Sequence, residues 1–329
     1  MHFIYGIIII ICYYLENKKL HKKDDNLSFL VIDLKGVPGF MEERETEKIL
    51  ITCDSALDVD EDLAKKYNIK ILPIVIQMDG EELLDVEDVK AQEILDYHDR
   101  TGELAVTSPP TVSQSFRFFT RFVHMGYTVI HLSMSSGMSP AYQNALDASQ
   151  TFGRVHVIDT KEASVGGAML AIHAAEMRQN GASSQEIIQA IESMIPRICI
   201  PFLIDEMEFL YQGGRASGLS AFMAGLLKIK PSLYIDSSNG TLVVNKKYMG
   251  KFDAAALKFL NENIKNGENM DKKHFILAHT GCSQDFLDAC VTEIDKLVHF
   301  QEIHVIRAGS TITSHLGKNC IILCWLNKS

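Results

Sequence analysis

Short apolar runs alternate with amphipathic segments from residue 49 onward. Apolar runs bounded by polar turns predict buried strands, and apolar residues repeated at helical spacing predict helices between them. The expected strands of the first half are Ile49–Thr52, Ile69–Ile76, which Pro73 breaks, Val129–Ser133 and Val155–Ile158. The expected helices are Asp58–Tyr67, Val89–His98, Ser115–Met125 and a helix from Pro140 to Gly153 with Ser139 as its N-cap. Because strands and helices alternate, this half predicts a doubly wound parallel sheet with helices on both faces.

The second half begins with two helices and continues mainly with strands. The first helix runs from about Glu162 to Gln179, and the second starts at Ser183 and ends before Pro196. Strands are expected at Ile198–Ile204, Ser232–Ile235, Thr241–Val244, Phe275–Ala278, Glu302–Arg307 and Ile321–Trp325. Asn239-Gly240 is a hairpin signal, so this half predicts an α/β domain with a mixed or antiparallel sheet. We therefore expect two α/β domains, residues 49–160 and 161–329.

The chain begins with a dense apolar run, Phe3–Leu15, followed by Lys18-Lys19 and Lys22-Lys23. These 13 residues are too few to span a bilayer core of about 30 Å as a straight helix. A signal peptide would place basic residues before the run rather than after it. We expect no stable membrane span, although a short anchor with its N-terminus outside is an alternative. We expect residues 1–48 to be an extension that is disordered or not translated, with Met41 as the functional start.

Composition excludes some classes of protein. Of 329 residues, 47% are hydrophobic, which is enough for a packed core. The 42 acidic and 32 basic residues give a net charge of −10, which argues against a nucleic-acid binder. The 7 cysteines are scattered without a Cys-x-x-Cys pair, as is typical of reduced thiols, so we expect a cytoplasmic protein.

Short polar blocks are spread over two hundred residues of the chain. The main ones are Thr107–Pro110, Ser133–Gln143, Gly213–Arg215 and Ser314–Gly317. They supply hydroxyls, backbone N–H groups, one arginine and one histidine. These groups suit the binding of an anion better than the breaking of a bond.

Each block also has a simpler structural explanation. The second block places Ser135, Ser136 and Ser139 between a strand end and a helix N-terminus, where an anion could bind, but one serine suffices as a helix cap. Thr107 and Ser108 could be plain turn residues. Arg215 could be an anion clamp or a surface residue. His315 could be an anion partner, a general acid or a structural histidine.

Motifs for other chemistries are absent. The sequence has no dinucleotide fingerprint, no P-loop and no nucleophile elbow. His299 with His304, and His279 with Cys282, lack a convincing set of further zinc ligands, so we expect no metal and no cofactor. Asp54, Ser55 and Asp58 could be catalytic or could form an ordinary turn.

Taken together, the blocks resemble the DegV family of bacterial lipid-binding proteins over about residues 49–326. The most specific block is Ser135–Ala145, which is similar to a family pattern like SSxLSGTYQSA. The other matching blocks follow in the family's order: Ile51–Ser55 with Asp58, Leu72–Ile74, Asp79-Gly80, Thr107-Ser108, Asp159-Thr160, Leu210–Arg215 and Leu226–Pro231.

The resemblance implies two α/β domains with a long-chain fatty acid in an apolar tunnel. The residues that it implies for the carboxylate are Thr107, Ser108, Ser135, Ser136 and Ser139, with Arg215 and His315 at the exit. Such a protein is a carrier and no enzyme by itself. Some family members present the bound acid to the ATP-binding subunit of a fatty acid kinase, which forms an acyl phosphate.

The sequence departs from the family pattern at places that bear on this kinase partner. Met249 stands where the family often has an arginine, Pro140-Ala141 replaces a usual Gly-Thr, and the family's terminal HTGPG becomes His315–Asn319. Docking to a kinase is therefore less well supported than lipid binding. An alternative function is a small-molecule transferase or hydrolase that uses Asp54, Ser55 and His315. A long apolar tunnel favours the lipid, and a small polar cavity favours the enzyme.

Overall fold

The computed structural model describes residues 47–215, 229–265 and 267–329. Residues 46–329 form one compact unit, to which everything below refers. The expectations for the N-terminal extension and for Met41 lie outside the described residues. Within the described ranges, no helix is long and apolar enough to cross a membrane.

The first sheet has four parallel strands in the order β2-β1-β6-β7. They are β2 (Lys70–Leu72), β1 (Ile49–Asp54), β6 (Thr128–Ser133) and β7 (Val155–Asp159). Every residue of β1 and β6 is buried, as expected for central parallel strands that are covered on both faces.

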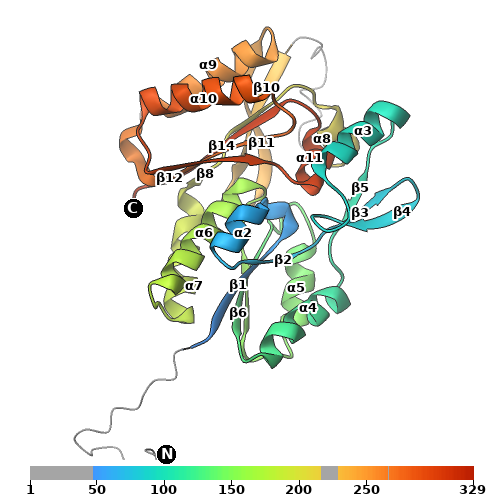
Figure 1. The fold of residues 1–329 in the computed structure, drawn as a ribbon, viewed down its shortest axis with the longest axis vertical. Coiled ribbons are helices and arrows are strands. Elements are labelled where there is room, and N and C mark those ends of the chain that lie inside the picture. The colour runs from blue at the N-terminus through green and yellow to red at the C-terminus, as the bar shows by residue number, and fades with distance from the viewer. Residues whose placement is uncertain (1–46, 216–228, 266) are drawn as a thin grey trace, which may run out of the picture. The chain divides into compact units, whose positions relative to one another are not determined.

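Helices cover both faces of this sheet (Figure 1). On one side lie α4 (Val112–His124) and α5 (Ala141–Ser149), which contact each other and β6. On the other side lie α6 (Val165–Gln179) and α7 (Ser184–Met194), with the short α2 (Glu61–Lys66). The predicted capping box of α4 is present: the Thr111 hydroxyl accepts from the Gln114 N–H, and Gln114 accepts from the Thr111 N–H.

The second sheet is mixed and has seven strands. Its order is β11-β10-β9-β14-β12-β13, with β8 also paired to β14. Only β12 and β13 pair in parallel among these described strands; the other pairs are antiparallel. The strands are β8 (Ile198–Cys199), β9 (Phe202–Ile204), β10 (Ile229–Asp236), β11 (Thr241–Met249), β12 (Met270–His279), β13 (Glu302–Arg307) and β14 (Cys320–Asn327).

This sheet is also buried on two faces. Along β12, Phe275 and Leu277 belong to the core beneath α9 (Phe252–Ile264) and α10 (Gln284–Leu297). Ile276 belongs to the larger core that includes the residues of α6. α6 contacts β1 and β6 of the first sheet and β12 and β14 of the second. Its residues 165–175 are all buried, as expected of a helix that is packed between two sheets.

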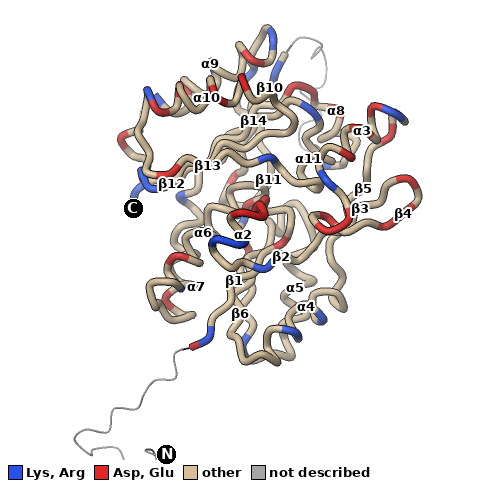
Figure 2. Tube along the Cα trace, in the orientation of Figure 1, with Lys and Arg blue, Asp and Glu red and all other residues tan. Residues whose placement is uncertain are grey.

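The combination of a parallel sheet and a mixed sheet confirms the predicted fold class. The predicted domain boundary at residue 160 precedes α6 and stays a prediction. Acidic and basic residues are interspersed along α3 (Ala91–Thr101), α9 and α10, so these helices present no basic stripe (Figure 2).

Several element boundaries were predicted wrongly. The break predicted at Pro73 within Ile69–Ile76 is present, but the two pieces, β2 and β3 (Val75–Met78), belong to different sheets, which was not predicted. A three-stranded antiparallel sheet, β4-β3-β5, contains β4 (Glu81–Leu84) and β5 (Val106–Ser108). α5 begins after Pro140, one residue later than expected, and ends at Ser149. The remaining short helices are η1 (Ser55–Leu57), η2 (Ile195–Arg197), α8 (Glu208–Gln212), η4 (Gly267–Asn269) and α11 (Ser310–Leu316).

Candidate functional site

An apolar pocket is lined partly by segments that follow strands of the first sheet and partly by residues on strands of the second sheet. It encloses about 730 Å³ between protein atoms, a volume that includes space open to solvent. Its apolar lining residues are Ile74, Pro109, Met134, Met138, Ala163, Ile200, Phe202, Leu210, Ile235, Leu242, Ile312, Leu316 and Ile322. Concave, mainly apolar sites with a few polar groups are typical binding sites for small molecules.

The polar lining residues are Thr107, Ser139, Ser164, Arg215, Thr311 and His315. Thr107 on β5 and His315 on α11 form a hydrogen bond, with 2.8 Å between Oγ1 and Nε2. The other ring nitrogen of His315, Nδ1, is buried and has no hydrogen-bond partner among the described residues. This nitrogen is packed close to Gly213, where a Cβ atom would lie 2.6 Å from it.

The charge state of this polar group follows from burial. Burial and, to a smaller extent, the positive charge of Arg215 together lower the pKa of His315 to about 4, so the imidazole is neutral at neutral pH. Burial also lowers the pKa of Arg215, whose Nη1 donates to the carbonyl of Gly213 over 2.7 Å. A guanidinium stays protonated in proteins, so Arg215 supplies a positive charge to the pocket.

Two of the polar lining residues already have buried partners. The Ser164 hydroxyl donates to Asp58 Oδ2 over 2.5 Å, and the Thr311 hydroxyl donates to Asp85 Oδ2 over 2.6 Å. Ser164 has a left-handed φ of 51°, which is uncommon for a residue other than glycine. Burial raises the pKa of Asp58 to about 7. These pairs fix the pocket wall and leave neither hydroxyl proton for a ligand.

The structure separates the residues that the sequence grouped as a carboxylate site. Thr107 and Ser139 line the pocket, as do Arg215 and His315, whereas Ser108, Ser135 and Ser136 do not. Whether the lining residues bind a carboxylate stays a prediction at this point.

The three serines outside the lining have other neighbours. Ser135 is fully buried and donates to the carbonyl of Gly240, over 2.7 Å, in the turn between β10 and β11. Ser136 is exposed, and its hydroxyl accepts from Lys161 Nζ over 3.0 Å. Ser108 lies on β5 and pairs with Val75 of β3.

The residues of the enzymatic alternative are not assembled in this pocket. Asp54 is buried, accepts from Ser133 Oγ and the Met134 N–H, and has Oδ1 3.2 Å from His131 Nε2. The Ser55 hydroxyl accepts from the Ile74 N–H over 3.0 Å. Neither residue lines the pocket with His315. Met249, at the position where the family often has an arginine, is 76% exposed at the end of β11.

A parallel and a mixed sheet that enclose an apolar pocket with a small polar group define an α/β protein with a site suited to an amphipathic ligand. The chain belongs to the DegV family. The model of that family, whose description is "uncharacterised protein, DegV family", matches residues 48–328. A DegV domain-containing protein of Caldanaerobacter subterraneus subsp. tengcongensis is 30% identical over 274 residues, 82% of this chain and 96% of that protein.

Solved structures of the family have the same fold. A DegV family protein from Thermus thermophilus, described by its fatty acid binding, has a TM-score of 0.79 at 25% identity. The match covers 85% of this chain and 100% of that chain. A Thermotoga maritima protein whose structure reveals a fatty acid binding function has a TM-score of 0.73 at 25% identity. That match covers 86% of this chain and 100% of the other.

Proposed function

We propose that this protein binds a long-chain fatty acid, with the acyl tail in the apolar pocket and the carboxylate at the polar group. The observation that carries the proposal is the pocket itself, an apolar lining joined to the Thr107–His315 hydrogen bond and the Arg215 guanidinium. The fatty acid binding of the Thermus and Thermotoga relatives supports it.

The tail supplies most of the affinity. About a dozen buried methylenes, at roughly 0.8 kcal/mol each, contribute about 10 kcal/mol before the costs of association and ordering are subtracted. The polar group mainly fixes the orientation of the acid. The positive charge of Arg215 keeps the carboxylate ionised, and a neutral His315 donates one N–H to a carboxylate oxygen.

We further propose that the protein is a cytoplasmic carrier that presents the acid to the ATP-binding subunit of a fatty acid kinase. The lack of any nucleotide-binding motif in the sequence supports this division of labour. In that reaction a carboxylate oxygen attacks the terminal phosphorus of ATP, ADP leaves, and an acyl phosphate forms. The exposed Met249 offers no charge to such a partner, so any docking contact at this position is apolar.

Native mass spectrometry of the full chain, purified without detergent, tests the proposal before and after solvent extraction. We expect a bound mass that matches one or a few fatty acids, lost on extraction and restored by added myristic, palmitic or stearic acid. A protein without bound mass that takes up none of these acids would contradict fatty acid binding.

The site assignment has a separate test. The double variant Thr107→Ala and Ser139→Ala removes two lining hydroxyls, so we expect it to retain less acid than the parent chain. The matched control is Ser136→Ala, which removes an exposed hydroxyl outside the pocket. Equal retention in both variants would leave fatty acid binding intact and refute the assignment.

A further inference from the structure

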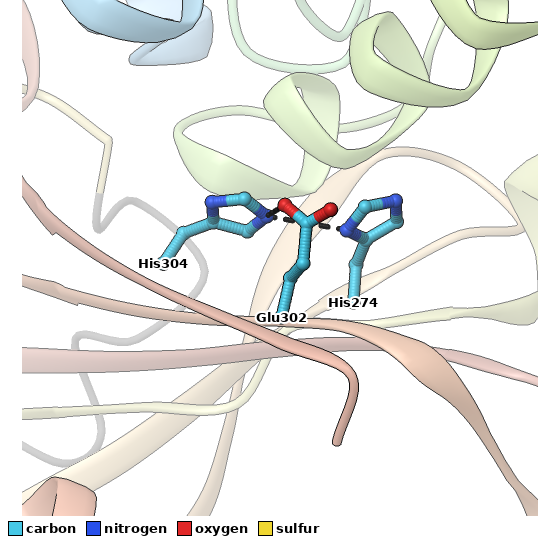
Figure 3. Close-up of side chains that lie close together, drawn as sticks. All are labelled: His274, Glu302 and His304. Atoms are coloured by element: carbon cyan, nitrogen blue, oxygen red, sulfur yellow. Dashed lines mark hydrogen bonds and ion pairs between the residues drawn. The ribbon is translucent and has the colours of Figure 1, made fainter.

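A second cluster of chemically active side chains lies outside the lining of the pocket. It consists of His274 on β12 and of Glu302 and His304 on β13, and their side chains project from the same side of the sheet (Figure 3). β12 and β13 pair in parallel with His274 opposite Glu302, and Glu302 and His304 are two positions apart on one strand. Residues two apart on a strand share a face, which explains why the three side chains converge.

The potential donor atoms of the cluster are close together. His274 Nδ1 lies 3.2 Å from His304 Nε2, and His304 Nε2 lies 3.6 Å from Glu302 Oε2. The three donor atoms all lie within 4.8 Å of one another. Two nitrogens that bind one tetrahedral zinc ion at about 2.0–2.1 Å are about 3.3 Å apart, so the spacing of the two imidazoles fits such an ion.

The other ring nitrogen of His274 contacts a carboxylate on α6. His274 Nε2 lies 3.1 Å from Glu176 Oε1, and the second oxygen of Glu176 accepts from Lys273 Nζ over 2.6 Å. An ionised carboxylate accepts hydrogen bonds only, so Nε2 of His274 donates to Glu176 and Nδ1 is the ring nitrogen that can offer a lone pair to a metal. A histidine oriented by a carboxylate in this way is the usual arrangement of a metal ligand and its outer partner.

We propose that His274 Nδ1, His304 Nε2 and Glu302 Oε2 form a binding site for a zinc-like divalent cation, with a fourth position for water. Two imidazoles and one carboxylate suit zinc and its neighbours among the transition metals and are a poor set for magnesium or calcium, which prefer oxygen ligands. The bound ion joins the edge strand β13 to β12 and, through Glu176, links both to α6.

One ammonium group competes with the ion. Lys66 Nζ donates to Glu302 Oε2 over 2.9 Å, so this oxygen must exchange a lysine for the metal. The side chains of Lys66 and Glu302 are 51% and 43% exposed, and an exposed ion pair of this kind is weak. Lys66→Met removes this ammonium group, which both competes for Glu302 and repels a cation, so the substitution strengthens metal binding.

Cobalt and zinc titrations of the full chain, stripped of metal with a chelator and kept reduced, test the site. We expect one Co²⁺ per chain with the intense visible absorption of a four-coordinate ion, displaced by one Zn²⁺. His304→Gln and Glu302→Gln each remove a ligand from a partly exposed position and are expected to abolish this absorption. Glu176→Gln removes only the outer partner and is expected to weaken zinc binding by about 10–100-fold.

The matched control is His299→Gln, because His299 is 86% exposed and pairs only with Asp295, 2.9 Å away, among its described neighbours. This variant is expected to keep the site intact. Thermal unfolding of each metal-free variant checks that the fold is retained. The proposal is overturned if no stoichiometric ion binds, if His304→Gln and Glu302→Gln bind as tightly as the parent, or if the cobalt spectrum shows thiolate ligands.

Discussion

Replacing Leu242 with alanine tests whether the acyl tail occupies the apolar pocket. Leu242 lies on β11, lines the pocket and is half-buried. Neighbouring residues on a strand point to opposite faces, so Val243 points away from the pocket. The core packing agrees, because Leu242 and Val244 pack against the core that Ile235 belongs to and Val243 is not part of that contact.

The size of the effect follows from the carbons removed. Leucine to alanine removes three carbons, which at about 0.8 kcal/mol each amounts to about 2.4 kcal/mol if the tail covers them fully. That energy is about a 50-fold increase in Kd, and half coverage gives about sevenfold. Val243→Ala removes two carbons outside the pocket and is expected to leave the Kd unchanged.

Palmitate binding to delipidated protein, measured by displacement of a fluorescent fatty acid, gives the two Kd values. Urea unfolding of both variants without ligand separates a loss of binding from a loss of fold. If Leu242→Ala and Val243→Ala are folded and bind palmitate equally well, the tail does not lie against Leu242 and the proposed orientation is wrong.

Two further predictions concern the fixed parts of the pocket wall. Burial raises the pKa of Asp58 to about 7 in the native state, whereas an unfolded aspartate ionises near 3.8. Between these two values the unfolded state releases a proton that the native state keeps. The stability that this group contributes is therefore present below pH 4 and is lost, by up to about 4 kcal/mol, as the pH rises to 7. Urea unfolding across this range should show the loss, and Asp58→Asn should flatten it; an equally steep profile in the variant would assign the effect elsewhere. Gly240→Ala should destabilise the fold more than Gly250→Ala, because both glycines have positive φ but only at Gly240 does a Cβ meet the Ser135 hydroxyl. The expected difference in unfolding free energy is about 1–3 kcal/mol, the cost of leaving a buried hydrogen-bonding group without its partner, and equal losses would contradict it.

The sequence predicted the regular elements of the fold well where periodicity was strong. β1, β6 and β7 are short apolar runs, and the capping box at Thr111 correctly marked the start of α4. The sequence predicted the break at Pro73 but not that the segment after it joins another sheet, because the choice of partner strand is decided by tertiary packing. The helix α11 was missed since its residues are almost all buried and show no amphipathic period.

The candidate site was only partly predictable for the same reason. Thr107 and His315 are 208 positions apart, and motif order suggested that they share a function without indicating a direct hydrogen bond. The sequence analysis considered His304 only together with His299 and expected no metal, so it missed the cluster that the structure forms around His304. Its partner His274 lies 30 positions away, and only the register between β12 and β13 brings the two rings together. No spacing rule for zinc motifs covers such a pair.

The hydroxyls that suggested a single anion site have two roles. Some line the pocket where the ligand is proposed to bind. Others join distant segments of the pocket wall, which explains how those segments form one pocket. Some join segments of the wall: Ser135 holds the β10–β11 turn, and Thr311 ties the start of α11 to Asp85. Asp58 does the same, because it accepts from both Ser164 and the N–H of Gly309. Buried polar groups of this kind are costly unless they are paired, so the pairing specifies one arrangement of the wall. The shape of the pocket therefore depends on these buried pairs as well as on the groups proposed to bind the carboxylate, so changes to the pairs would alter binding too.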